Sequence, residues 1–134
     1  YEVMRTKSIA KKNRAIQTKL EKVISYTKQT MVAYMSEEDL NRLCTYVAEY
    51  SSGDTSQKIT PVKVDSQLKS IDIMHFGWNI GKAFDRKRIH TATFIKNVFA
   101  HTLRDLEIST IERKMSHTES EHIIKLNVNI GNTN

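Results

Sequence analysis

One stretch of the sequence, residues 6–35, contains neither glycine nor proline, and its apolar side chains recur at spacings of three, four and seven residues. The apolar positions are Ile9, Ile16, Leu20, Val23 and Tyr34. This spacing is the period of an α-helix. A helix of about 30 residues is roughly 45 Å long. Because a small domain is narrower than that, we expect one end of the helix to protrude or to pack on another chain.

The same stretch can also be read as heptads, with Asn13 at an a position, where a polar residue can set the register of a dimer. Three of the eight a and d positions are polar, namely Asn13, Thr27 and Thr30. Such a seam is weak, so the pattern favours an ordinary helix packed on the core over a coiled coil. A homodimer formed through this helix remains open.

Further helices follow the first one. Ser36 before three acidic residues predicts a helix start and a second helix over residues 37–50. Residues 51–64 contain Ser, Gly and a single Pro and predict a loop. Residues 65–116 predict a helix-rich core, in which Gly77 and Gly81 share one helix face and let a neighbouring helix approach closely.

The C-terminal residues have the pattern of a strand and not that of a helix. The alternation near residues 122–130 predicts a short strand. A lone strand is unstable in water, so it needs a partner, either residues 58–64 or a second subunit.

Length and composition agree with one mainly α-helical domain over residues 1–134. The chain is 134 residues long, close to the size that a single core supports. Its four Gly and one Pro are too few for a many-stranded sandwich. We expect about five helices, a helix-turn-helix-like C-terminal half, and one or two short β-strands.

The cysteine content and the hydropathy of the chain indicate the compartment in which the protein is expected. Cys44 is the single cysteine, so an intramolecular disulfide is excluded and a reducing compartment is indicated. No stretch approaches the roughly 18 to 20 apolar residues that a membrane span needs. We therefore expect a soluble, cytoplasmic protein that does not associate with membranes.

Positive charge is concentrated in two blocks. The formal net charge is +6, and the excess lies in residues 1–30 and 61–90. Basic blocks suit phosphate or another acidic partner, although solubility alone also explains them. The partner that we expect is DNA.

Residues 92–115 predict a helix, a turn of a few residues and a second short helix, as in a helix-turn-helix. In that motif the second helix enters the major groove with its first residues towards the bases. Ser109 and Thr110 are then candidates for contacts to bases or phosphates, Arg113 for guanine or phosphate, and Lys114 for phosphate. Two further groups are candidates for contacts to the phosphate backbone: Arg86, Lys87 and Arg88 beside the motif, and Lys11, Lys12 and Arg14 on the first helix.

The order of residues within this segment resembles the C-terminal part of the RteC-type regulators of conjugative transposons in Bacteroides-like bacteria. The likeness runs from Phe94-Ile95-Lys96-Asn97-Val98-Phe99 through Leu103-Arg104-Asp105 to Thr110-Ile111-Glu112-Arg113-Lys114. It departs from the family at the start of the second helix, where Ile108-Ser109-Thr110-Ile111 stands in place of an aromatic-rich sequence. The resemblance implies a DNA-binding accessory or transcription regulator of a mobile element, and only Arg113 and Lys114 carry over as site residues.

Catalytic patterns are missing from the sequence. No two of the five histidines are four residues apart, as two histidine ligands on one helix face would be. His75, on an apolar helix, is expected to be a core residue with satisfied hydrogen bonds. No Gly-rich phosphate loop or nucleophile elbow is present. We expect a non-catalytic protein with no metal, cofactor or small-molecule substrate. The alternative function is a protein-interaction module that uses the long first helix and binds no nucleic acid.

Overall fold

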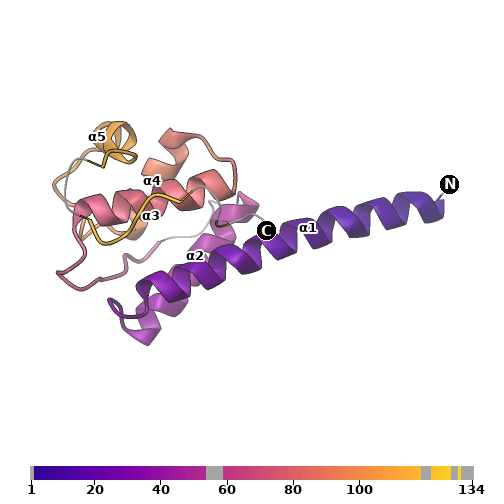
Figure 1. The fold of residues 1–134 in the computed structure, drawn as a ribbon, viewed down its shortest axis with the longest axis horizontal. Coiled ribbons are helices and arrows are strands. Elements are labelled where there is room, and N and C mark those ends of the chain that lie inside the picture. Colours follow the sequence, from indigo (N-terminus) through magenta and orange to yellow (C-terminus); the bar gives the residue numbers. More distant parts are fainter. Residues whose placement is uncertain (1, 54–58, 119–121, 128–129, 131–134) are drawn as a thin grey trace.

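The structure, a computed structural model, describes residues 2–53, 59–118, 122–127 and 130, and side chains within the first helix from residue 17 onward. Its five helices are α1 (Glu2–Met31), α2 (Glu37–Ser52), α3 (Ser70–Ala83), α4 (Arg88–Val98) and α5 (Ile108–Lys114) (Figure 1). The described residues include no strand. The fold is therefore mainly α-helical.

The helices share one apolar core. Its fully buried side chains include residues from all five helices and from the segment after α4, namely Val23, Met31, Leu43, Val47, Ile73, Phe76, Ile80, Ile95, Val98, Phe99, Leu103 and Ile111. The last turns of α1 contribute Val23 and Met31 to this core. That the first helix extends beyond the domain stays a prediction, because the side chains of residues 1–16 lie outside the described part.

The predicted start of α2 is confirmed. The hydroxyl of Ser36 accepts a hydrogen bond from the backbone amide of Asp39 at 3.2 Å, which satisfies one of the free amides at the helix start. The helix continues to Ser52 and ends at Gly53, whose φ of 80° is left-handed. Glycine adopts this conformation without steric cost, so it can end the helix by bonding its amide to the last carbonyls.

The predicted close approach at Gly77 and Gly81 is also confirmed, and the neighbouring helix is α4. A Cβ atom added to Gly77 would lie 2.6 Å from Cγ2 of Ile95. One added to Gly81 would lie 3.0 Å from Cγ2 of Thr91 and closer still to its hydroxyl. Any side chain larger than hydrogen at these two positions would push the helices apart.

The short strand expected over residues 122–130 is wrong for residues 122–127, which form an irregular segment across α3 (Figure 1); residues 128–129 lie outside the described part. Its expected partner strand is wrong as well. Residues 59–64 instead bond to helices, with the Val62 amide donating to the Val98 carbonyl at 2.9 Å.

Side chains of α3 take the place of that partner strand. Asp72, His75 and Asn79 are all buried. Asp72 accepts from the amides of Ile123 and Ile124, the latter at 3.0 Å. Asn79 donates to the Lys125 carbonyl at 2.8 Å. These side chains therefore bond part of the backbone of the segment, where a strand would bond to a ladder.

His75 completes this buried row and confirms the expectation of a satisfied core histidine. Its Nδ1 lies 2.8 Å from the carbonyl of Ile124, and its Nε2 lies 2.5 Å from the carbonyl of His117. Carbonyl oxygens only accept, so a ring nitrogen that carries a hydrogen donates it to the carbonyl that it faces. His75 thus ties the start and the middle of the C-terminal segment to one helix.

Candidate nucleic-acid interface

Arg88 joins the first turn of α4 to the last turn of α5. Its guanidinium donates to the Glu112 carbonyl from Nε at 3.2 Å and from Nη2 at 2.6 Å. Its Nη1 donates to the hydroxyl of Ser116 at 3.2 Å. These bonds satisfy carbonyl groups at the end of α5 that have no partner within the helix. As a result, the residues on either side of Arg88 and those at the end of α5 lie together.

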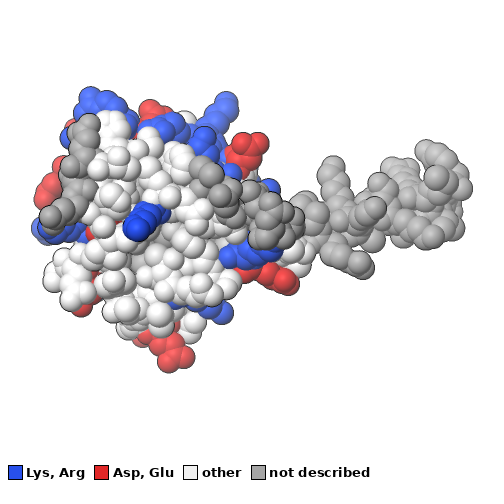
Figure 2. Space-filling model, viewed as in Figure 1, with Lys and Arg blue, Asp and Glu red and all other residues white. Residues whose placement is uncertain are grey.

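We name the resulting cluster, Lys87, Arg88, Arg113 and Lys114, the basic corner. All four residues are exposed. Within the described part of the chain, ion pairs join Arg42 to Asp39 and Arg104 to Asp105, and none includes a residue of the basic corner. Figure 2 shows Lys and Arg side chains along the upper edge of the protein, with acidic side chains between some of them. The corner therefore presents cations that no described carboxylate neutralises at contact distance.

The side chain of Arg86 points away from the basic corner. Its Nη2 donates to the carbonyl of Ser51 at 2.9 Å, at the end of α2. Its guanidinium carbon lies 5.8 Å from the centre of the Tyr50 ring, a cation–π contact. Of the three consecutive basic residues, Arg86 thus faces α2, whereas Arg88 faces α5.

The expected turn of a few residues between the two helices of residues 92–115 is wrong. Residues 99–107 connect α4 to α5, and α5 has only seven residues. Lys96 holds this connection, because its Nζ donates to the carbonyls of Leu103 at 2.7 Å and Leu106 at 2.6 Å. A helix-turn-helix joins its helices by three or four residues, so this geometry differs from that motif.

The remaining predicted site residues differ in how exposed they are. Ser109 is exposed at the start of α5, whereas Thr110 is half-buried and Ile111 is fully buried. Only one of the two hydroxyl residues therefore projects freely from the helix start. The side chains of Lys11, Lys12 and Arg14 lie outside the described part of α1.

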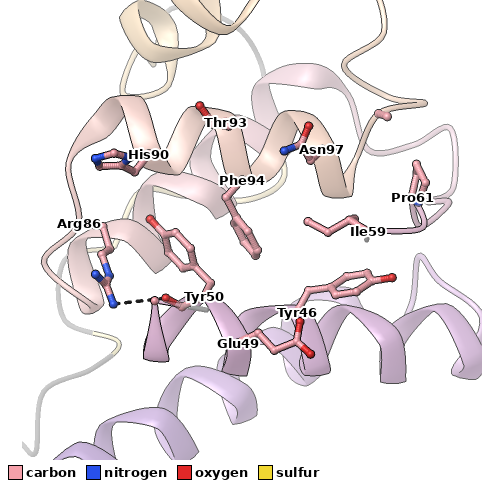
Figure 3. Close-up of a pocket in the computed structure, with 12 residues that line it drawn as sticks. Tyr46, Glu49, Tyr50, Ile59, Pro61, Arg86, His90, Thr93, Phe94 and Asn97 are labelled. Atoms are coloured by element: carbon pink, nitrogen blue, oxygen red, sulfur yellow. Dashed lines mark hydrogen bonds between the residues drawn. The ribbon is translucent and has the colours of Figure 1, made fainter. Parts of the chain in front are cut away.

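A pocket of about 750 Å³ lies between α2 and α4. Figure 3 shows Phe94 pointing from α4 towards α2, with Tyr46 and Ile59 across the space from it. Polar side chains stand at its edges, with Asn97 on the α4 side and Glu49 on the α2 side. An apolar interior with a few polar groups at the edge is typical of small-ligand sites.

Tyr50 forms one wall of this pocket. Its ring stacks on Phe94 with 4.3 Å between the ring centres, and its hydroxyl lies 2.7 Å from that of Thr91. Burial raises the pKa of the Tyr50 hydroxyl, although the hydrogen bond with Thr91 and the charge of Arg86 lower it in part. The wall is therefore a neutral, fixed aromatic surface.

The sequence did not reveal this pocket. Tyr50 and Phe94 both contribute to the apolar interior. The separation of α2 and α4, which creates the pocket, could not be predicted from the sequence. The one available signal was the row of polar residues His90, Thr93 and Asn97 at helical spacing beside Phe94 on α4, which an entirely buried helix would not carry.

The described residues carry neither a cluster of metal ligands nor a membrane-spanning helix. They contain no group of three or more His, Cys, Asp or Glu side chains that is placed to hold a metal ion. None of their helices is long and apolar enough to cross a membrane. Comparisons with family models, with curated proteins and with solved structures found no match to this chain.

Proposed function

We propose that the protein binds nucleic acid through the basic corner, and that its cations contact phosphate groups. The observation that supports this most is the set of hydrogen bonds from Arg88 to the end of α5, because it gathers Lys87 and Arg88 with Arg113 and Lys114. Phosphates condense counterions, and their release drives the binding of clustered Lys and Arg. Arginine adds geometric preference, because its guanidinium forms paired bonds to phosphate oxygens.

The start of α4 adds to this field. Lys87 caps the helix without a side-chain hydrogen bond to its first amides. Free amides at a helix start carry partial positive charge and attract anions. The amides therefore reinforce the nearby cations of the basic corner.

The mode of contact follows from the size of α5. Seven residues of helix extend about 10 Å, and one face of that helix is used to pack Ile111 into the core. Little of α5 remains for reading bases in a groove, so backbone contact by Arg113 and Lys114 is the better-supported mode. A regulatory or accessory role on a mobile element, as the RteC-like layout implies, belongs to this proposal.

The alternative, a protein-interaction module built on the first helix, also stays a prediction. So does a homodimer formed through that helix. Both depend in part on side chains of residues 1–16, which lie outside the described part.

A titration tests the proposal. Fluorescence anisotropy would measure the dissociation constant for a random-sequence oligonucleotide at about 50 mM and about 200 mM salt. The Arg113→Ala/Lys114→Ala variant should bind about tenfold more weakly at low salt, and its salt dependence should fall by about two counterions. The matched control is Lys63→Ala/Lys125→Ala, which removes two exposed lysines from other parts of the surface.

The control should stay within about twofold of the wild type. Equal weakening in both variants would mean that only net charge matters, and no binding at low salt would overturn the proposal altogether.

A further inference from the structure

The lining of the pocket between α2 and α4 includes Arg86, the residue that precedes Lys87 of the basic corner. Arg88 belongs to the corner as well. Two residues of chain span at most about 7 Å, and from there the side chain of Arg86 runs towards α2 and that of Arg88 towards α5, so a strand of a few nucleotides on the corner can reach the pocket. This proximity connects an aromatic cavity with a phosphate-binding surface.

The lining of the pocket suits a flat ring system, and its volume leaves ample room for one. Its volume of about 750 Å³ falls within the range of about 300 to 1,000 Å³ that is typical of small-ligand pockets. Phe94, Tyr46 and Ile59 give it apolar walls on two sides (Figure 3). Protein sites for unpaired bases combine aromatic walls of this kind with nearby cations.

We propose that the nucleic acid bound at the basic corner is single-stranded, and that one unstacked base enters this pocket. This inference rests on the proposed function. A duplex base is stacked and paired, and must be flipped out at an energetic cost before it can enter such a pocket. A single strand pays little of that cost, so the pocket discriminates against duplexes.

The pocket edge also predicts which bases are preferred. The Glu49 carboxylate only accepts hydrogen bonds, whereas the Asn97 amide donates and accepts. Adenine and cytosine present an amino group on the pairing edge, and uracil and thymine present carbonyl oxygens flanking one N–H. A carboxylate at the edge therefore favours bases with an amino group on that edge, adenine and cytosine among them, over uracil or thymine.

Filling the pocket tests the inference. The variant Thr93→Leu/Asn97→Leu places two larger apolar side chains at the α4 edge. The matched control is Asn41→Leu/Thr45→Leu on α2, which makes the same two exchanges four residues apart at exposed positions. The two threonines are also alike, because each donates its hydroxyl to the carbonyl four residues earlier. Circular dichroism and urea unfolding would establish that both variants are folded.

The ligands are fluorescent single strands of about 12 nucleotides, one of adenine and cytosine and one of uracil, and a duplex of equal length. The filled-pocket variant should bind the adenine and cytosine strand about tenfold more weakly than the wild type does, as expected for the loss of one base stacked on aromatic side chains. Its affinity for the duplex, and both affinities of the control, should stay within about twofold.

Glu49→Gln supplies a second measurement. Its amide donates as well as accepts, so the preference for the adenine and cytosine strand over uracil should shrink several-fold.

The outcomes separate this inference from the proposed function. If Arg113→Ala/Lys114→Ala weakens both ligands while the filled-pocket variant weakens neither, nucleic-acid binding stands and the base pocket is overturned. Equal losses for single strand and duplex in the filled-pocket variant also overturn it. If the wild type binds no oligonucleotide, both proposals fail.

Discussion

The two sides of α4 meet their neighbours in opposite ways. Towards α3, Thr91 and Ile95 sit against Gly81 and Gly77, where a single added methyl group would collide. Towards α2, Phe94 stacks on Tyr50, and a pocket opens past this pair. One helix is thus close-packed on one face and borders a cavity on the other.

The size of the facing side chains explains the difference. Glycine has no Cβ, so the α3 backbone can approach α4 until the side chains of α4 touch it. The facing side of α2 instead carries Tyr46, Glu49 and Tyr50, which hold the two helices apart. Stability should therefore depend strongly on the α3 side of α4, whereas substitutions of Thr93 and Asn97 at the pocket edge should be well tolerated.

Shortening a side chain on the packed side should have the largest effect. Ile95 is fully buried, so Ile95→Ala leaves a cavity against Gly77 that the tight backbone contact cannot close. We expect the free energy of unfolding, measured by urea denaturation, to fall by about 4 kcal/mol. Thr93→Ala, two residues away on the pocket side, is the control and should change it by less than about 0.5 kcal/mol. Similar losses in both variants would contradict the contrast.

Adding one methyl group to the packed side should cost less but still be clear. Gly81→Ala gains about 1 kcal/mol of helix propensity, yet its Cβ collides with Thr91. We expect a net loss of about 2 kcal/mol in the free energy of unfolding. Because the clash is with that one side chain, Gly81→Ala/Thr91→Ala should recover part of the loss in a double-mutant cycle. Additive losses would show that the helices are not in direct contact there.

Tyr50 contacts both sides of α4. Its hydroxyl lies beside Thr91 on the close-packed side, and its ring stacks on Phe94 on the pocket side. Tyr50→Phe keeps the ring stacked on Phe94 but removes the hydroxyl that lies 2.7 Å from that of Thr91. We expect a loss of about 1 kcal/mol in the free energy of unfolding near neutral pH, typical of one hydrogen bond. A change as large as that of Ile95→Ala would mean that the hydroxyl contact organises the whole pocket wall.

The stability of Tyr50→Phe should also respond less to alkaline pH than that of the wild type. Burial raises the pKa of Tyr50 above its ordinary value of 10.0. The folded state therefore favours the neutral phenol, and the associated stability is present below that pH and is lost as the pH rises through the folded-state pKa. Wild-type stability should thus fall above about pH 10, and that of Tyr50→Phe should fall less. Parallel curves would contradict a buried Tyr50.

Local sequence signals predicted the start of α2 and a close helix contact at Gly77 and Gly81, although not which helix makes that contact. The Ser36 cap acts over three residues, and the spacing of Gly77 and Gly81 is a property of one helix face. Both depend on interactions close in sequence or on the simple absence of a side chain. Such features can be read from a single chain.

Other features depend on residues far apart. The strand prediction for residues 122–130 failed because Asp72, His75 and Asn79, some 50 residues earlier in the chain, take up the backbone hydrogen bonds of the segment. Alternation alone cannot distinguish these side-chain partners from a neighbouring strand. The basic corner was predicted only as two separate groups of cations, since their meeting depends on the side chain of Arg88 reaching the carbonyl of Glu112.

The smallest expected effect is at Asn97, on the pocket side of α4. Its side chain is exposed, and among the described residues no hydrogen bond of that side chain is found. Asn97→Ala should therefore change the free energy of unfolding by less than about 0.5 kcal/mol, measured by the same urea titration. Asn79→Ala is the matched control, because that buried amide bonds to the backbone at Lys125 and Asn127 and its loss should cost about 2 kcal/mol. If Asn97→Ala were as costly as Asn79→Ala, the pocket edge would be part of the structural core, and the α2 side of α4 would no longer be free to bind a ligand.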